Sequence, residues 1–411
     1  MILEYKYRNY RSFKDNVEFS LLAPSNKVKN RFPNNYVKYN NGYDVLKTIA
    51  IVGENAGGKT NFVKSLNYFK DTVLSNEPVR SFKAEINSSV VQSDYPDGCD
   101  TSQAFEIVII DDSKSIYKYN LEFDFYGVVK EELATKTKKT SEYNQVFCVE
   151  RTELKTNDKA KTAKSAYSIT SGFDGKEMNR IIDSSSKEGN RPVCFVNLFS
   201  ILGEPNSLAF LKWLRERLSV ERAIVNYNII KSLSNEEEDK EIMNDPKFFE
   251  IFKMIDYSIT NIIINDEDPY KKTVVVRTSE NGTEFKRELK DDSSGVNEFF
   301  PLAIELYKVV YLNKTVIVDE MDRVLNPVLS DRIVSFINGS EHEGQFLFTT
   351  HNALHLNLKN YMKEQIYFVT KSIETLESEM YSLADFPEVR YETTKIYEFY
   401  MKGILGGTAS E

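Results

Sequence analysis

The glycine-rich segment at 53–60, GENAGGKT, restricts what this chain can fold into more than any other feature. It fits the pattern GxxxxGK[ST] and lies between a predicted strand at 46–52 and a predicted helix at 59–74. Glycine permits a tight loop whose amide N–H groups converge on phosphate oxygens, and the helix directs its positive end at the same anion. The segment therefore predicts a phosphate-binding unit of strand, loop and helix.

Two side chains of this loop indicate a magnesium nucleotide as the ligand. Lys59 can bridge the β- and γ-phosphates of ATP as a point charge, and Thr60 can ligate Mg²⁺ through its hydroxyl. A glycine-rich turn that is closed by a helix N-terminus and binds no ligand is the alternative. The residues of this segment that we expect to bind ATP are Gly53, Asn55, Gly57, Gly58, Lys59, Thr60 and Asn61.

An acidic pair, Asp319 and Glu320, follows the run TVIV at 315–318. This run has the character of a central parallel strand that is covered on both faces. Ligands gather at the carboxyl ends of such strands. Asp319 can hold Mg²⁺ through its water shell, and Glu320 can orient and deprotonate an attacking water. Taken alone, the pair is also compatible with a solvated strand end.

The order of the motifs along the chain makes the functional interpretation of the acidic pair more specific. The residues SSG at 293–295 begin a predicted helix 26 residues before Asp319. The residues TTH at 349–351 end a predicted strand 31 residues after Glu320. At this point the sequence resembles the ABC/SMC class of ATPases, in which a signature loop, a Walker B strand, a D-loop and a switch histidine follow one another in this order.

The closer resemblance is to the RecF-like and OLD-like AAA family ATPases of bacterial anti-phage and abortive-infection systems. Matching segments lie near both ends of the chain and leave the middle, 152–256, outside. They are NYRSFK at 9–14, DSSGV at 292–296, DEMDRVLNP at 319–327, QFLFTTHN at 345–352, QIYFVTK at 365–371, EMYSLADF at 379–386 and GILGG at 403–407.

The resemblance implies a homodimer in which two ATP molecules lie between the subunits. Ser293 and Gly295 of one subunit would reach the γ-phosphate that is bound on the other, an arrangement that requires two-fold symmetry. Assembly of these dimers into higher oligomers is left open by the sequence.

The resemblance also implies roles for four further residues. Glu320 and His351 would be catalytic, with His351 touching the γ-phosphate or the water. Arg11 and Ser12 would lie near the base or the α-phosphate.

Three positions depart from the family pattern. Asp292 stands where Glu is usual and Val296 where Thr is usual, which removes one expected hydrogen bond from the signature. Asn326 replaces His after the Walker B strand, which puts the coupling within the dimer in doubt more than hydrolysis. No Q-loop glutamine stands out, and Gln103 is the only candidate that we name.

We expect an α/β fold, a P-loop NTPase with an ABC/SMC-type nucleotide-binding head. The head would consist of a mixed sheet with flanking helices and an antiparallel N-terminal β lobe, with a mainly helical insertion. The expected division is an N-terminal half of the head at 1–151, the insertion at 152–256 and a C-terminal half at 257–411. Within the insertion, the acidic run at 235–241 is expected to be a turn.

Composition narrows the cellular setting. The longest apolar runs are far shorter than the roughly 20 residues that span a bilayer, so we expect no membrane segment. The opening residues lack the pattern of a secretory signal. The three cysteines form neither a disulfide framework nor a zinc spacing, as in a reducing cytoplasm. The net charge of −9 opposes long-range attraction to nucleic acid, so DNA is compatible with the sequence but not implied.

The functional hypothesis is a cytoplasmic ATPase that switches between open and closed states. By family analogy, it would be the sensor or regulator of a separately encoded effector, a nuclease or toxin, in phage defence. The alternatives are a RecF-like DNA-binding repair or replication factor and an ATP-dependent scaffold with little turnover. The acidic trio Asp266, Glu267 and Asp268 follows a strand, as metal-binding acids of TOPRIM nucleases do, but an exposed acidic turn is the expected structure.

Overall fold

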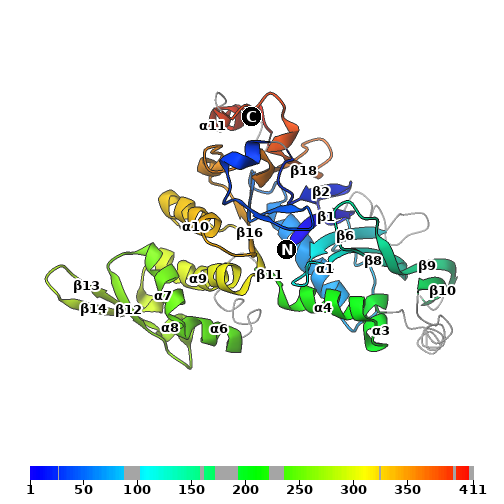
Figure 1. The fold of residues 1–411 in the computed structure, drawn as a ribbon, viewed down its shortest axis with the longest axis horizontal. Helices are drawn as coiled ribbons and strands as arrows, with labels where there is room; N and C mark the ends of the chain where they lie inside the picture. The colour runs from blue at the N-terminus through cyan, green and yellow to red at the C-terminus, as the bar shows by residue number, and fades with distance from the viewer. Residues whose placement is uncertain are drawn as a thin grey trace.

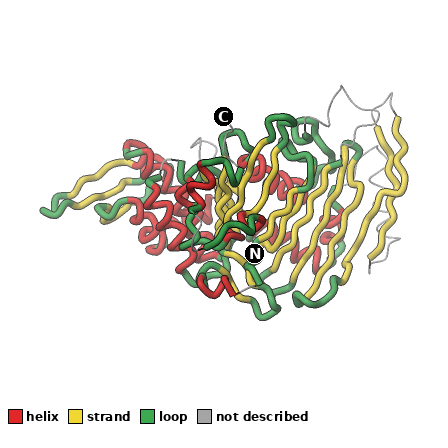
Figure 2. Tube along the Cα trace, turned by 90° about the horizontal axis from the view of Figure 1, so that it is seen from above, coloured by secondary structure: helices red, strands yellow, loops and turns green. Residues whose placement is uncertain are grey.

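The computed structural model describes residues 1–25, 27–87, 102–157, 162–171, 193–221, 236–323, 325–391 and 395–406. Two large sheets organise these residues, and a small sheet projects from the helical side of the molecule (Figure 1, Figure 2). The mixed α/β architecture with an antiparallel N-terminal lobe agrees with the expected fold class.

The N-terminal sheet is antiparallel, and its side chains alternate between a buried and a solvated face. On β1, for example, Tyr5 and Tyr7 are buried in an aromatic cluster with Phe62 and Phe69, whereas Lys6 lies on the outer face. The strand order is β10 (Thr162–Ser171), β9 (Asn144–Asn157), β8 (Gly127–Lys136), β7 (Ile116–Asp124), β6 (Gln103–Ile110), β1 (Ile2–Arg8) and β2 (Val17–Ser20).

The second sheet is parallel apart from one edge strand. All residues of its central strand, β5, are buried, because this sheet is covered on both faces. β5 lies between β16 and β17, strands that are about 300 residues later in the chain. The strand order is β11 (Leu218–Glu221), β15 (Thr315–Val318), β16 (Gln345–Thr350), β5 (Thr48–Gly53), β17 (Ile366–Lys371) and the antiparallel β18 (Ser378–Ser382).

Helices fill the space between the two sheets and cover the far face of the parallel one. On β5, Ile49 and Ile51 belong to the core that contains α1, and Ala50 and Val52 to the core that contains α9. The helices are α1 (Lys59–Leu74), α3 (Phe195–Ile201), α4 (Pro205–Glu216), α6 (Glu236–Asn244), α7 (Pro246–Phe252), α8 (Pro269–Lys272), α9 (Ser294–Leu312), α10 (Pro327–Gly339) and α11 (Ile396–Met401).

The remaining elements are short. The projecting sheet consists of β12 (Ile259–Ile263), β13 (Val274–Thr278) and β14 (Glu284–Glu288), and a hairpin of β3 (Tyr36–Lys38) and β4 (Asp44–Leu46) precedes β5. The 3₁₀ turns are η1 (Lys27–Arg31), η2 (Lys253–Ile255), η3 (Leu289–Asp291), η4 (Ala353–His355), η5 (Lys363–Gln365) and η6 (Leu383–Asp385). None of the helices in the described ranges combines the length and apolar character needed to cross a membrane.

The described part of the expected insertion at 152–256 contains the helices α3, α4, α6 and α7 together with strands that join the two large sheets. β9 runs across the expected boundary at residue 152, and β10 continues the antiparallel sheet. β11 pairs with β15 and so belongs to the parallel sheet. Residues 236–241 of the acidic run lie in the helix α6 rather than in a turn. Asp239 Oδ1 of this helix lies 2.9 Å from the buried Lys308 Nζ of α9. Sequence periodicity did not show these distant partners.

One glutamine joins the two large sheets. Gln345 of β16 is fully buried, and its Nε2 donates to the carbonyls of Ile2 (2.9 Å) and Leu46 (3.2 Å). Its Oε1 accepts from the amide of Ile2 (2.6 Å) and the hydroxyl of Thr315 (3.0 Å). A leucine of similar size would remove all four of these buried hydrogen bonds.

We therefore expect Gln345→Leu to lower the free energy of unfolding by about 3 kcal/mol, since each of the four lost hydrogen bonds contributes about 0.5–1.5 kcal/mol. Equilibrium urea unfolding measures this loss. The matched control is Gln145→Leu at an exposed position of β9. Equal stability of the two variants would contradict a structural role for the Gln345 side chain.

Candidate nucleotide-binding site

The loop between β5 and α1 has the conformation that its glycines permit. Gly58 has a φ of 123°, in the left-handed region that favours glycine. Gly53 lies so close to β17 that a Cβ built on it would be 2.2 Å from the carbonyl oxygen of Val369. Gly57 is buried behind this strand, whereas Asn55 is exposed at the tip of the loop. The loop is therefore shaped by backbone contact with β17.

The N-terminus of α1 can receive an anion. Among the described residues, no side chain caps this helix. The amides of its first turn, at Lys59, Thr60 and Asn61, can therefore face a ligand, and the helix dipole favours negative charge there. This arrangement fits the phosphate groups that the motif predicts.

Lys59 lies in the first turn of α1 with its ammonium folded over the loop. Its Nζ donates to the carbonyls of Gly53 and Glu54, each at 2.8 Å. Burial lowers the pKa of Lys59 from 10.5 to about 8, and the nearby carboxylates of Asp319 and Glu320 oppose this shift. The structure thus holds a poorly solvated positive charge beside the phosphate loop.

The acidic pair lies at the carboxyl end of β15, and Thr349 of the neighbouring strand β16 fixes its orientation. The Thr349 hydroxyl donates to Asp319 Oδ1 (2.6 Å) and accepts from the backbone amide of Glu320 (2.7 Å). Glu320 has a φ of 51°, so the chain turns sharply there. Asp319 remains buried while the Glu320 side chain is partly exposed.

His351 follows β16 and lies between the phosphate loop and the acidic pair. Its Nδ1 is 3.3 Å from Lys59 Nζ, and its Nε2 is 3.8 Å from Glu320 Oε1. Burial and the positive charge of Lys59 lower the pKa of His351, although Glu320 acts in the opposite direction. The lowered pKa favours the neutral ring, whose Nδ1 can accept a hydrogen bond from Lys59.

Part of the N-terminal motif NYRSFK, at 9–14, lies beside the phosphate loop and α1. Ser12 Oγ accepts from Asn61 Nδ2 (2.8 Å), which places this hydroxyl beside the first turn of α1. The Arg11 guanidinium makes two hydrogen bonds of 2.7 Å to the carboxylate of Glu85, so its donors face a protein partner. Ser12 thus lies beside the start of α1, and Arg11 is held by Glu85.

The signature residues cap α9. Ser293 Oγ accepts from the amide of Val296 (3.4 Å), and Gly295 lies in the first turn. Asp292 is paired with Arg277 of β13 at 2.7 Å. α9 begins beside the β12–β14 sheet and ends beside β11 (Figure 1). The contacts of Ser293 are thus with its own helix start, and no described contact joins it to the phosphate loop of the same chain.

The structure shows the surroundings of two further groups of residues. Gln103 is a poor Q-loop candidate, because its amide is fully buried and donates to the carbonyls of Asn9 (2.9 Å) and Glu85 (3.0 Å). Asp266 and Glu267 are exposed in the turn after β12, as expected of a solvated acidic turn. Among the described residues, no three His, Cys, Asp or Glu side chains gather as a metal-ligand group.

Sequence reasoning assigned no role to two residues at the site. Thr349, which orients the acidic pair, could have been found because it directly precedes Thr350 and His351 at the end of a strand. Ser378 of β18 contacts the phosphate loop, but no pattern in the sequence connects it with residues more than 300 positions earlier. Asn326, the departure from His, caps α10 by accepting from the amide of Val328 (2.8 Å).

The sequence matches a known family over residues 49–357, which are 309 of the 411 residues. That family is described as "AAA domain, putative AbiEii toxin, Type IV TA system". The chain belongs to this AAA family. The matched range includes the phosphate loop, the acidic pair and His351. No curated protein sequence matches it.

Several solved structures are similar to this AAA protein. An SMC head bound to the C-terminal winged-helix domain of ScpA aligns with a TM-score of 0.46 and 13% identity, over 93% of this chain and 97% of that chain. The SMC head domain from Thermotoga maritima aligns with a TM-score of 0.41 and 12% identity, over 93% of this chain and 98% of that chain. A third structure is an SMC head with an extended coiled coil, bound to the C-terminal domain of ScpA derived from Pyrococcus furiosus. It aligns with a TM-score of 0.43 and 13% identity, over 93% of this chain and 96% of that chain.

The oxygen ligands of this AAA protein fit a magnesium ion. Thr60 and Lys59 both lie in the first turn of α1. The carboxylate of Asp319 is near enough to Lys59 to raise the pKa of that ammonium group. Mg²⁺ prefers such hard oxygen ligands and is commonly shared between one or two protein groups and substrate phosphates. Thr60 and Asp319 are therefore the residues that would hold it.

The buried charge of Lys59 predicts a pH-dependent cost to the stability of the AAA protein. Because the folded pKa lies below the unfolded one, the unfolded state binds more protons between about pH 8 and 10.5, so stability rises with pH in that window. We expect Lys59→Met to raise the free energy of unfolding at pH 7 by about 1–3 kcal/mol and to prevent nucleotide binding.

Urea unfolding at pH 7 and pH 9.5 measures the difference, which should fall by about half at the higher pH. Lys64→Met, at a less buried position of α1, is the matched control. A Lys59→Met protein that is no more stable than wild type at pH 7 would contradict the burial cost.

Proposed function

We propose that this AAA protein binds ATP with Mg²⁺ and hydrolyses it slowly, and that the bound nucleotide switches it between open and closed states. One observation carries the proposal: Lys59, Asp319, Glu320 and His351 converge where the adjacent strands β5, β16 and β15 end. These residues come from three separate parts of the sequence, and the types are those that phosphoryl transfer requires.

The proposed division of work follows from these positions. Lys59 and the amides of the loop would bind the phosphates, and Thr60 and Asp319 would hold Mg²⁺, which would supply positive charge near the transferred phosphoryl group. Glu320 accepts the proton of the attacking water, because its partly exposed carboxylate can reach solvent. His351 would form a hydrogen bond with the γ-phosphate or with the water.

The active unit would be a two-fold homodimer. Ser293 and Gly295 lie at an exposed or partly exposed helix start whose described contacts do not include the chain's own phosphate loop. The Asp292–Arg277 pair fixes this start relative to β13, so it can be presented as a rigid surface to a second subunit. ATP bound on one subunit would then be completed by the signature residues of the other.

The proposed biological role is phage defence by abortive infection in the cytoplasm. The family description, which names an AbiEii toxin and a type IV toxin–antitoxin system, supports this role. We propose that the chain acts as the ATPase sensor or regulator of a separately encoded nuclease or toxin. A gene for such an effector beside this one would support the role, and neighbouring replication genes would argue for the DNA-binding alternative.

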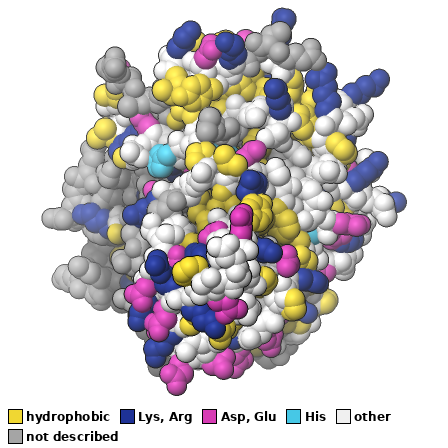
Figure 3. Space-filling model, turned by 90° about the vertical axis from the view of Figure 1, so that its left-hand side faces the viewer, with side chains coloured by type: hydrophobic (Ala, Val, Ile, Leu, Met, Phe, Trp, Pro, Cys, Tyr) yellow, Lys and Arg dark blue, Asp and Glu magenta, His cyan; other side chains and the backbone are white. Residues whose placement is uncertain are grey.

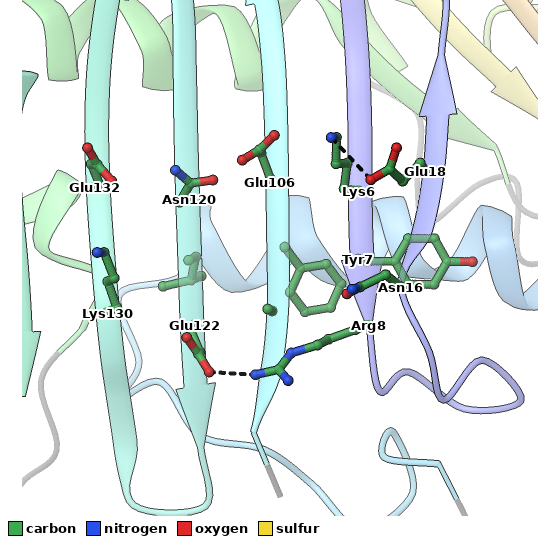
Figure 4. Close-up of a pocket in the computed structure, with 13 residues that line it drawn as sticks. Lys6, Tyr7, Arg8, Asn16, Glu18, Glu106, Asn120, Glu122, Lys130 and Glu132 are labelled. Atoms are coloured by element: carbon green, nitrogen blue, oxygen red, sulfur yellow. Dashed lines mark hydrogen bonds and ion pairs between the residues drawn. The ribbon is translucent and has the colours of Figure 1, made fainter. Parts of the chain in front are cut away.

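Charge does not favour the DNA-binding alternative. The outer face of the seven-stranded sheet carries a groove of about 390 Å³, shown in Figure 4. Two ion pairs lie in this groove: Lys6 Nζ is 3.4 Å from Glu18 Oε1, and Arg8 Nη2 is 2.7 Å from Glu122 Oε1. On the face in Figure 3, basic and acidic side chains are interspersed over the projecting sheet. The charged side chains of the groove are Lys6, Arg8, Lys130, Glu18, Glu106, Glu122 and Glu132.

We expect Glu320→Gln to lower the rate of phosphate release at least about 100-fold, because removing a general base costs roughly 10²–10⁴ in rate. ATP binding should persist, so the variant should accumulate in the ATP-bound dimer. Phosphate release and light scattering measure the two effects. Glu374→Gln, in the exposed turn between β17 and β18, is the control. Unchanged turnover would remove Glu320 from the mechanism, and absence of turnover in wild type would favour the scaffold.

Ser293→Arg tests the shared site. In a Glu320→Gln background, where ATP stays intact, the arginine should block the approach of a second subunit and abolish the ATP-induced dimer. Binding of ATP to the single subunit should stay within about twofold, as expected for a distant, independent site. Thr283→Arg, on the exposed turn between β13 and β14, is the matched control. An undiminished dimer in the Ser293→Arg protein would argue against composite sites.

A further inference from the structure

Ser378, the first residue of β18, makes two hydrogen bonds that join distant parts of the chain at the phosphate loop. Its hydroxyl donates to the carbonyl oxygen of Gly57 at 2.6 Å. Its backbone amide donates to the carbonyl oxygen of Ser12 at 2.7 Å. Only 5% of Ser378 is exposed, so water does not compete well for these bonds.

The serine is also in close contact with the last glycine of the loop. A Cβ built on Gly58 would lie 2.5 Å from Ser378 Oγ and 3.2 Å from Ser12 Oγ. Ser12 Oγ in turn accepts from Asn61 of α1. The loop, the N-terminal turn, the start of α1 and β18 therefore form one hydrogen-bonded unit on the side of the loop that Ser378 covers.

The bond to Gly57 has a directional consequence. In a trans peptide the C=O of one residue and the N–H of the next lie in one plane and point in opposite directions. The structure contains no cis peptide bond among its described residues. Because Ser378 holds the carbonyl of Gly57, it directs the amide of Gly58 to the opposite side, away from β18.

We propose that Ser378 is a positioning residue of the nucleotide site, which aims the Gly58 amide at the phosphates. The proposal rests on the proposed binding of ATP, and it adds a residue that lies outside the range 49–357 matched by the family. Ser378 itself does not touch the nucleotide. It fixes the peptide unit between Gly57 and Gly58, and without it that unit can rotate and lose its alignment.

The test compares Ser378→Ala with Ser382→Ala, a buried serine at the other end of β18. Dissociation constants for MgADP and MgATP, with KM and kcat, are measured for the full chain. We expect Ser378→Ala to weaken both nucleotides about three- to tenfold, the effect of one neutral hydrogen bond. KM should rise while kcat at saturation stays within about twofold, because ground state and transition state lose the same contact. Ser382→Ala should bind as wild type does.

The outcomes separate this proposal from the one on which it rests. Wild-type protein that binds neither nucleotide would defeat both proposals. Wild-type binding that is unchanged in Ser378→Ala would overturn only the role of Ser378, as would an equal loss in Ser382→Ala. If Ser378→Ala does not fold, Ser378→Cys, which keeps a weak S–H donor, takes its place. Affinity of the cysteine variant between about one third and one tenth of wild type supports the proposal, and wild-type affinity contradicts it.

Discussion

The close approach of β17 to the phosphate loop is the contact on which the rest of the site depends. The carbonyl oxygen of Val369 occupies the space where a side chain at Gly53 would lie, and β17 continues into the strand that carries Ser378. On its other side, β5 pairs with β16, which places Thr349 and His351 opposite the loop. Parallel pairing thus brings the carboxyl ends of the strands to one edge, where ligands bind in such sheets.

Several features of the site lower the stability of the fold and hold the site in a conformation ready to bind a ligand. Lys59 is buried at a cost, while backbone carbonyls and nearby acids offset part of that cost. Glu320 occupies a left-handed backbone conformation that is unusual for a glutamate, and Thr349 holds it there. Such strained and desolvated groups cluster at functional sites because the surrounding structure fixes them in advance. The packing on both faces of β5 supplies this support.

Sequence reasoning found the features whose signal is local and missed those that depend on distant partners. The loop at 53–60, the strand before Asp319 and the helix after Ser293 were predicted because motif, periodicity and cap lie together. The helix α6 was missed because Lys308, which neutralises Asp239, lies far along the chain. Likewise, nothing near Arg11 indicated its pairing with Glu85, and the sheet membership of β11 required a partner almost 100 residues later.

The position of β5 between two late strands has a consequence during synthesis on the ribosome. Residue 371 at the end of β17 follows β5 by more than 300 residues, a delay of roughly 15 to 65 s at translation rates of about 5–20 residues per second. Until β16 has been synthesised, the apolar strand TIAIVG has neither of its neighbours and exposes unpaired edges that favour aggregation. A chaperone that shields emerging strands would therefore be needed most until β16 and β17 have left the exit tunnel.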